Sequence, residues 1–282
     1  MILWEYSLNE ANYFANGLAG RVMMYHNRWL LEICRRRGYR VLPVLLYNKS
    51  EATGEEQSLY RGALADLLAR YGLHSVDAQQ LWLRDFSHLS ADVLYRDNPH
   101  YSTETDFLRA LAQAVLEQAS QAVIPEAEAQ AARYEGKDLQ FLMPSAPTPI
   151  RFSNRILDCE IYPFADSLRI NMSGRLLACL LLSTHREPPI RFETETQKRG
   201  PYAVQISRRE SGPQVQLKHL IPWNPVNKPL TVEECLVVSA CKVSRKPVVQ
   251  HTLAWNGACP PETGADAAAR GGMIGVLAEV AG

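Results

Sequence analysis

The sequence predicts two domains of different class: an α/β domain built on a parallel sheet, then a mainly-β domain. In roughly the first 120 residues, short apolar runs alternate with amphipathic stretches of helical length. Such alternation is typical of parallel strands joined by right-handed helical crossovers in a three-layer α/β/α sandwich. After residue 150 the runs are strand-length and separated by Gly, Pro, Asn or Ser. This second pattern favours a β-sandwich, for example a jelly roll.

The α/β prediction rests on a regular order of elements. Strand, helix, strand, helix, strand and helix are expected over residues 2–8, 18–37, 41–47, 55–71, 74–77 and from about 103. The first two strands are almost wholly apolar, as strands covered by helices on both faces are. Gly38 and Gly72 follow the first two helices and mark their ends. Ser102 or Thr103 is the expected cap of the last helix.

Changes in composition predict the domain boundaries. The α/β domain is placed at residues 1–124, and an Ala/Glu-rich, then Pro-rich linker at 125–150. The β domain is placed at 151–260, with an Ala/Gly-rich tail at 261–282 that we expect to be disordered. About eight short strands are expected in the β domain, over residues 155–162, 167–172, 175–183, 189–195, 202–208, 214–221, 234–243 and 247–255.

Composition excludes several classes of partner. The 30 basic and 30 acidic residues balance and are scattered, so nucleic acid is not an expected partner. The six cysteines contain no C-x-x-C pair and are interpreted as reduced, mostly buried thiols. No short His or Cys spacing indicates a metal, and no cofactor is expected. The longest apolar run, residues 176–182, is too short to span a membrane. No signal peptide is visible, so a cytoplasmic location is expected for the sequence as written.

Polar residues with chemical potential lie where a parallel sheet gathers its functional groups. Asn9 follows the first strand, and Asp97 and His100 lie in the loop before the last helix. The carboxyl ends of parallel strands share one rim, on which loops converge. There an amide can donate to an oxyanion, and a histidine three residues after an aspartate can act as a base that the aspartate orients. These are two of the three functions that acyl transfer needs.

Each of these residues also has an ordinary structural explanation. An Asn at a strand end is most often a turn residue. The Asp-x-x-His pattern occurs a second time, at Asp85–His88. We favour Asp97 and His100 because a capped amphipathic helix follows them directly. Trp223 and Trp255 fit core packing better than a sugar-stacking surface.

With these residues identified, about the first 122 residues resemble the SGNH (GDSL-like) hydrolase family, a flavodoxin-like α/β fold of esterases, deacetylases and some acyltransferases. The strand that ends at Asn9 and Glu10 resembles the family's third block, whose Asn belongs to the oxyanion hole. Asp97-Asn98-Pro99-His100 resembles its fifth block, D-x-x-H. The resemblance implies that His100 takes the proton of a nucleophilic serine, that Asp97 orients His100, and that Asn9 donates to the oxyanion.

The chain departs from the family at its start. The family's nucleophilic serine follows its first strand and an oxyanion-hole glycine follows its second, and both would lie upstream of Met1. The resemblance therefore implies a sheet that is incomplete at its N-terminus, with an apolar edge at strand 2–8 covered by a missing N-terminal segment or by a partner. The isolated chain is expected to be inactive.

The expected function is that of a serine esterase or deacetylase that removes acyl groups, in particular acetyl, from a carbohydrate or related small substrate. A polysaccharide O-acyltransferase that uses the same residues is a close alternative. The rival from another class is a non-catalytic protein, in which the α/β domain is a relic and the β domain binds a carbohydrate or another protein.

Overall fold

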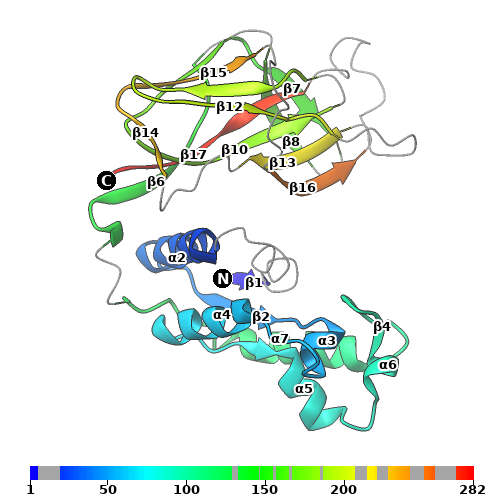
Figure 1. The fold of residues 1–282 in the computed structure, drawn as a ribbon. Helices are drawn as coiled ribbons and strands as arrows, with labels where there is room; N and C mark the ends of the chain where they lie inside the picture. The colour runs from blue at the N-terminus through cyan, green and yellow to red at the C-terminus, as the bar shows by residue number, and fades with distance from the viewer. Residues whose placement is uncertain are drawn as a thin grey trace. The chain divides into compact units, whose positions relative to one another are not determined.

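The computed structural model spans residues 1–282, and the residues it describes are 1–5, 20–128, 133–145, 147–154, 157–164, 167–184, 187–206, 215–220, 228–241, 251–257 and 271–282. The chain divides into two compact units, Met1–Glu135 (unit 1) and Gly136–Gly282 (unit 2), shown in Figure 1. The boundary falls within the segment predicted as a linker.

Unit 1 alternates strands and helices around a parallel sheet. Its elements are β1 (Ile2–Trp4), α2 (Gly20–Arg36), β2 (Val41–Leu45), α3 (Lys49–Ala52), α4 (Leu59–Arg70), β3 (Val76–Asp77), α5 (Ala78–Asp85), α6 (Ala91–Leu94), β4 (Tyr95–Asp97), β5 (His100–Tyr101) and α7 (Phe107–Ala119). β1 pairs with β2 and β2 with β3, each in parallel, so these strands stand in sequence order. Parallel pairs require crossover connections, and α2 and α4 lie in them. Unit 1 is therefore mixed α/β.

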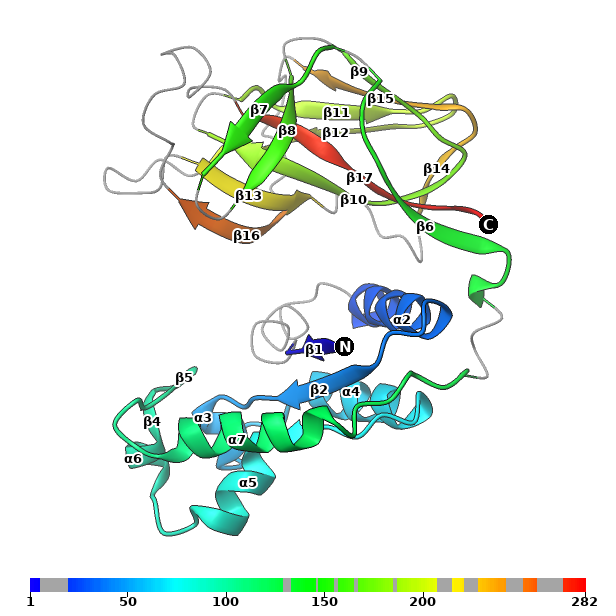
Figure 2. The ribbon, with the colours of Figure 1, turned by 180° about the vertical axis from the view of Figure 1, so that it is seen from behind.

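Helices cover β2, and its five residues are buried. α2 packs against α4 and α5 against α7, while α7 also contacts β2 and β3. Figure 2 shows α7 lying across β2 on the side nearer the viewer. Trp29, Leu67 and Phe107, from α2, α4 and α7, are almost wholly excluded from solvent. This burial explains why β2 reads as a continuous apolar run rather than an alternating one.

The helix boundaries differ from expectation in two places. The helix predicted over residues 55–71 is α4, which begins after Ser58, whose Oγ accepts the Arg61 amide at 3.2 Å. The cap predicted at Ser102 or Thr103 is wrong, because α7 begins at Phe107 after Asp106. The Ser102 Oγ instead accepts the Glu104 amide at 3.2 Å, which closes a local turn before the helix.

Among the described strands, β1 lies at one edge of the parallel sheet and β3 at the other. Among the described strands β1 pairs only with β2, and the Leu3 side chain is 53% exposed. The strand predicted over residues 2–8 is described only to Trp4, and Asn9 lies outside the described residues.

Unit 2 is built from strands in two larger sheets. Its elements are β6 (Lys137–Leu142), β7 (Ile150–Ser153), β8 (Asp158–Pro163), β9 (Leu168–Asn171), β10 (Gly174–Ser183), β11 (Ile190–Glu193), β12 (Lys198–Tyr202), β13 (Val215–Leu220), β14 (Leu230–Val232), β15 (Cys235–Ala240), β16 (His251–Gly257) and β17 (Gly272–Ala281). One sheet follows the order β16-β13-β10-β17-β8-β7, with β14 paired to β10 and β6 to β17. The other follows the order β12-β11-β15-β9.

The two sheets of unit 2 share one hydrophobic core. The larger sheet contributes Leu176 and Val276, and the smaller sheet contributes Phe192 and Leu236, all fully buried. Alternating residues of β9 and β11 face this core while their neighbours are more exposed. Such alternation is typical of strands with one buried face, so unit 2 has the layered β architecture that the sequence predicts.

The predicted linker and tail are both corrected by unit 2. The tail predicted to be disordered over 261–282 contains β17, which pairs with β10, β8 and β6. The linker predicted over 125–150 contains β6. Glycine is typical of disordered segments, but at Gly275 it is needed for packing, because a Cβ atom there would lie 2.5 Å from the Phe141 Cζ. Gly271, Gly272 and Gly275 are therefore required by close packing between strands.

Several expectations from composition concern cysteines, membranes and metals. The five cysteines within the described ranges are all free, with Cys34 and Cys179 buried, and Cys259 lies outside these ranges. No helix in the described part of the chain is long and apolar enough to cross a membrane. The described residues likewise contain no group of three His, Cys, Asp or Glu side chains that could hold a metal ion. Trp223 and the side chain of Trp255 are not among the residues and side chains that the structure describes.

Candidate active site

The Asp97–His100 pair is built by a hairpin. β4 and β5 are antiparallel, with Asp97 opposite His100 and only Asn98 and Pro99 between them. Opposed residues of an antiparallel pair project side chains on the same face, about 5 Å apart at Cβ. The Asp97 Oδ1 lies 2.6 Å from the His100 Nδ1 and also accepts the His100 backbone amide at 3.2 Å. The three-residue spacing of the motif is therefore the spacing of a two-residue hairpin turn.

This contact determines which nitrogen of His100 is available. In a neutral imidazole whose Nδ1 contacts a carboxylate, the proton sits on Nδ1 and the Nε2 lone pair is free. The His100 side chain is 61% exposed and that of Asp97 is 47% exposed. A hydroxyl group that approaches from solvent can therefore reach the His100 Nε2 and transfer its proton there.

The Asp97 carboxyl group remains ionised next to its partners. Partial desolvation raises the pKa of Asp97, but hydrogen bonds from His100 and from Arg96 outweigh it, so the pKa lies below its ordinary value. The Arg96 Nε lies 3.3 Å from the Asp97 Oδ2, while Oδ1 serves His100. An ionised Asp97 is the state that stabilises an imidazolium.

The hairpin turn is attached to the segment that follows β2. The Asn98 carbonyl oxygen accepts the Lys49 amide at 2.7 Å, and the Asn98 Oδ1 accepts the Ser50 amide at 3.0 Å. Lys49 and Ser50 form the first turn of α3, where backbone amides lack partners within the helix. The Lys49 ammonium also pairs with Asp92, in the helix before β4. These bonds hold the turn at the carboxyl end of β2.

Two tyrosines of the hairpin hold its other side to the same rim. The rings of Tyr95 and Tyr101 stack with centroids 4.6 Å apart. The Tyr101 hydroxyl accepts the Tyr47 amide at 3.2 Å, and the Tyr95 hydroxyl donates to the Tyr47 carbonyl at 3.1 Å. Tyr47 lies two residues after β2 ends. The hairpin therefore replaces the ladder hydrogen bonds that Tyr47 would make if the strand continued.

The ends of β2 and β3 are joined beneath the hairpin. The Tyr47 hydroxyl donates to the Asp77 Oδ2 at 2.7 Å, and the Asp77 Oδ1 accepts the Gln80 amide, which caps α5. Burial, and then the hydrogen bond to Asp77, raise the pKa of Tyr47, so its phenol stays protonated and can donate. The rim is thus a connected polar layer rather than a set of separate loops.

A buried ion pair between Glu51 and Arg61 packs against the ring of Tyr47. The Arg61 Nε and Nη2 bind the two Glu51 carboxylate oxygens at 2.8 and 2.9 Å. The guanidinium also lies 4.0 Å from the centre of the Tyr47 ring. Both charged side chains are largely buried, at 12% and 7% exposed. Such bidentate geometry offsets the cost of taking two charges out of water.

The second Asp-x-x-His motif forms no such pair. Asp85 ends α5 and binds the guanidinium of Arg84, with its Oδ1 and Oδ2 at 2.9 and 2.7 Å. The His88 ring instead stacks on Phe86, with centroids 6.1 Å apart. The preference for Asp97 and His100 over Asp85 and His88 therefore has a geometric basis.

The third residue of the predicted site, Asn9, lies outside the described residues. β1 runs parallel to β2, so its carboxyl end faces the rim that carries the hairpin. Sequence reasoning missed Asn98 and Tyr47, which hold the hairpin there. The Asn98-Pro99 dipeptide is a turn signal that predicts a hairpin between Asp97 and His100. Nothing in the local sequence around Tyr47 indicates its long-range contacts.

Comparisons with known proteins complete the description of the chain. No protein-family model and no curated protein matches the sequence. Among solved structures, two crystal structures of a two-domain esterase (CEX) active on acetylated mannans, one of them co-crystallised with mannopentaose, match with TM-scores of 0.46 and 0.44 and 10% identity. The matches cover 86% of this chain but 64% and 63% of those chains, so the chain spans less than two thirds of their length. Likeness at this level assigns neither a family nor an activity to the chain.

Proposed function

We propose that this chain carries the acid–base part of an SGNH-type serine ester hydrolase that removes acetyl groups from a carbohydrate. The observation that supports this most is the 2.6 Å contact between the Asp97 Oδ1 and the His100 Nδ1, in a hairpin bound to the carboxyl end of β2. An oriented, solvent-facing imidazole at this rim is suited to proton transfer during acyl transfer.

In the proposed mechanism, a serine hydroxyl attacks the ester carbonyl and transfers its proton to the His100 Nε2. Asp97 keeps the ring oriented and stabilises the imidazolium that forms. The imidazolium then returns the proton to the leaving sugar oxygen, and a second cycle with water releases acetate. Asn9 is assigned to the oxyanion hole, where loss of one such donor costs about 3 kcal/mol.

The nucleophile and the rest of the sheet belong to the same proposal. The parallel order β1-β2-β3 is compatible with the last three strands of a flavodoxin-like sheet. In that arrangement a strand that carries the serine pairs with the free edge of β1. We propose that this strand comes from a segment upstream of Met1 or from a partner chain.

An esterase assay with matched histidine variants tests the proposal. Turnover of p-nitrophenyl acetate and release of acetate from acetylated oligosaccharides are measured for this chain and for the product of the reading frame extended upstream of Met1. We expect turnover in the extended protein and a loss of roughly 10³-fold or more in His100→Ala. His88→Ala, from the second Asp-x-x-His motif, is the control, and we expect it to leave turnover unchanged.

Two outcomes contradict the proposal. One is the absence of turnover in both forms of the protein, which would favour the alternative hypothesis of a non-catalytic binding protein. The other is an equal effect of His88→Ala and His100→Ala, which removes His100 from the mechanism.

A further inference from the structure

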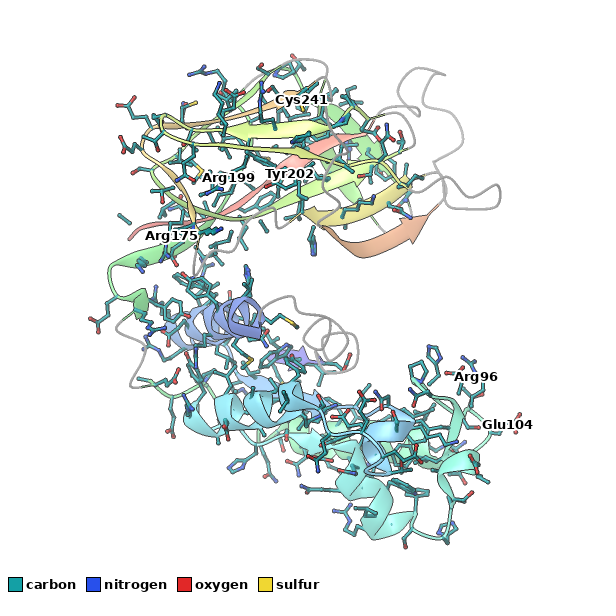
Figure 3. The ribbon with its side chains drawn as sticks, in the orientation of Figure 1. Arg96, Glu104, Arg175, Arg199, Tyr202 and Cys241 are labelled. Atoms are coloured by element: carbon teal, nitrogen blue, oxygen red, sulfur yellow. The ribbon has the colours of Figure 1, made fainter. Side chains whose placement is uncertain are left out.

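A polar pocket opens beside the candidate active site. It is lined by Asp92, Val93, Arg96, Ser102, Glu104 and Thr105, from α6, β4 and the turn before α7, together with Tyr95. Figure 3 shows Arg96 and Glu104 at the same end of unit 1. Every lining residue lies within 14 positions along the chain, and β4 of the hairpin that positions His100 contributes Tyr95 and Arg96 to the lining.

The charges of the pocket select against an acidic ligand. Arg96 is engaged by the Asp97 carboxylate, and Asp92 by the Lys49 ammonium. In the described part of the chain no ion pair involves Glu104. The pocket and its bonded neighbours therefore carry three carboxylates against two cations. A neutral ligand avoids the repulsion that a carboxylate or phosphate would meet here.

The hydrogen-bonding side chains of the pocket are complementary to the hydroxyl groups of a sugar. The free carboxylate of Glu104 accepts hydrogen bonds, the Arg96 guanidinium has donors beyond the Nε that contacts Asp97, and the Ser102 hydroxyl can donate while accepting the Glu104 amide. Val93 is 50% exposed and offers an apolar surface to the C–H groups of a sugar ring. Vicinal hydroxyls are donors and acceptors at once, and such a mixed lining satisfies both.

The pocket is connected to His100 through Arg96. The Arg96 Nε contacts the Asp97 Oδ2 at 3.3 Å, and the Asp97 Oδ1 contacts the His100 Nδ1 at 2.6 Å. A ligand held by Arg96 therefore lies two side chains away from the candidate base.

We propose that this pocket binds the hydroxyl groups of a neutral sugar residue, so that a neighbouring acetylated position lies at His100. The inference rests on the proposed function for the role of the sugar as substrate, but binding itself requires no catalysis. The hairpin is thus both the support of the candidate base and part of the substrate-binding surface.

Titration of the ¹⁵N-labelled full chain with unacetylated oligosaccharides tests the inference. The probes are mannopentaose, cellopentaose and xylopentaose, with trigalacturonic acid as the acidic comparison. We expect at least one neutral probe to shift the backbone amide signals of residues 92–105, and trigalacturonic acid to bind more weakly. Glu104→Gln should raise the Kd of that probe about tenfold, because hydrogen bonds to a charged carboxylate are replaced by weaker bonds to a neutral amide oxygen. The same change at the exposed Glu117 on α7 is the control and should leave the Kd unchanged.

His100→Ala separates this inference from the proposed function. The variant of this chain should bind the neutral probe as the parent chain does, and the same change in the extended protein should abolish turnover. If the signals of residues 92–105 shift but the extended protein has no esterase activity, the pocket is supported and the proposed function fails. The inference is overturned if no neutral probe binds, if the shifted signals belong to residues 136–282, or if Glu104→Gln behaves like Glu117→Gln.

Discussion

Arg61 is the buried charge on which the rim of the parallel sheet depends. Its guanidinium binds Glu51 through two nitrogens, lies over the Tyr47 ring and donates to the Leu46 carbonyl. Tyr47 in turn holds the hairpin that carries His100. The Glu51–Arg61 pair is therefore a support of the candidate site as well as part of the fold of unit 1.

Removal of one partner of this pair should destabilise unit 1 strongly. Glu51→Ala leaves the Arg61 charge buried without its carboxylate, and we expect a loss of about 3–5 kcal/mol in the free energy of unfolding. Glu55→Ala, at an exposed position four residues away, should change it by less than about 0.5 kcal/mol. Urea unfolding followed by tryptophan fluorescence measures both variants. Similar small effects in the two variants would show that the Glu51–Arg61 pair does not support the rim.

At the level of elements, a single carboxylate holds the turn between β14 and β15. The Glu195 Oε1 accepts the amides of Cys235 and Glu234 at 2.8 and 3.0 Å, and Oε2 accepts that of Glu233 at 3.2 Å. The Cys235 amide, and then those of neighbouring residues, lower the pKa of Glu195 from its ordinary value of 4.5 to about 2. The hydrogen bonds therefore favour the ionised form.

Glu195 should make the stability of unit 2 depend on pH in acid. Because the pKa in the folded state lies below that in the unfolded state, the unfolded chain takes up the proton first. The stabilisation is complete above about pH 4.5 and is lost as the pH falls toward about 2. Glu195→Gln should remove part of this dependence. Urea midpoints at pH 6 and pH 3 check this, and an unchanged difference between the two would contradict the assignment.

The sequence predicts elements well where the signal is local. The helix predicted over 18–37 is α2, and the apolar run 41–47 contains β2. The run predicted at 175–183 is β10, whose long apolar character reflects the burial of side chains on both of its faces. Each of these elements expresses its environment in its own residues, so periodicity and composition are sufficient.

The elements that sequence reasoning missed depend on distant partners. β17 contains Gly272 and Gly275 because it crosses close to Tyr162 and Phe141, and the Ala- and Gly-rich sequence before it makes the whole end of the chain resemble a flexible tail. β6 has no regular buried face and is a strand because it pairs with β17. When β17 is not predicted as a strand, its partner β6 cannot be predicted either.

In the candidate site, too, local features can be predicted from the sequence and long-range contacts cannot. Asp97 and His100 are recognisable because a two-residue turn places them together within four positions. The attachment of their hairpin to Tyr47 joins residues 48 and 54 positions apart, which no local pattern encodes. The sequence therefore identifies the candidate acid–base pair better than it identifies the contacts that support it.

At the level of the whole molecule, each unit has a core of its own. The core of unit 1 is formed by residues from Trp4 to Ala122. Unit 2 has a large core between its two sheets and a smaller cluster around Phe152 and Ile161. Units with separate cores commonly unfold as separate cooperative transitions.

A crowded glycine in β17 tests this independence. A side chain at Gly272 would meet the Tyr162 carbonyl oxygen and the Ile161 side chain, so Gly272→Val should cost roughly 2–3 kcal/mol through overpacking. In scanning calorimetry we expect one of two transitions to fall by roughly 5–10 °C while the other stays in place. Gly62→Ala in α4, where a Cβ meets nothing within 4 Å, is the control and should stabilise unit 1 slightly. A single transition that moves as a whole would contradict the two-core description.

The geometry of the Asp97–His100 pair is the point on which the functional account depends, and the tautomer of His100 tests it most directly. Long-range ¹H–¹⁵N correlation spectra of the full chain, at a pH where the ring is neutral, distinguish a proton on Nδ1 from one on Nε2. We expect the proton on Nδ1, next to the Asp97 Oδ1, and we expect Asp97→Asn to shift the population toward Nε2. A proton mainly on Nε2 in the unaltered chain, or no response to Asp97→Asn, would contradict it.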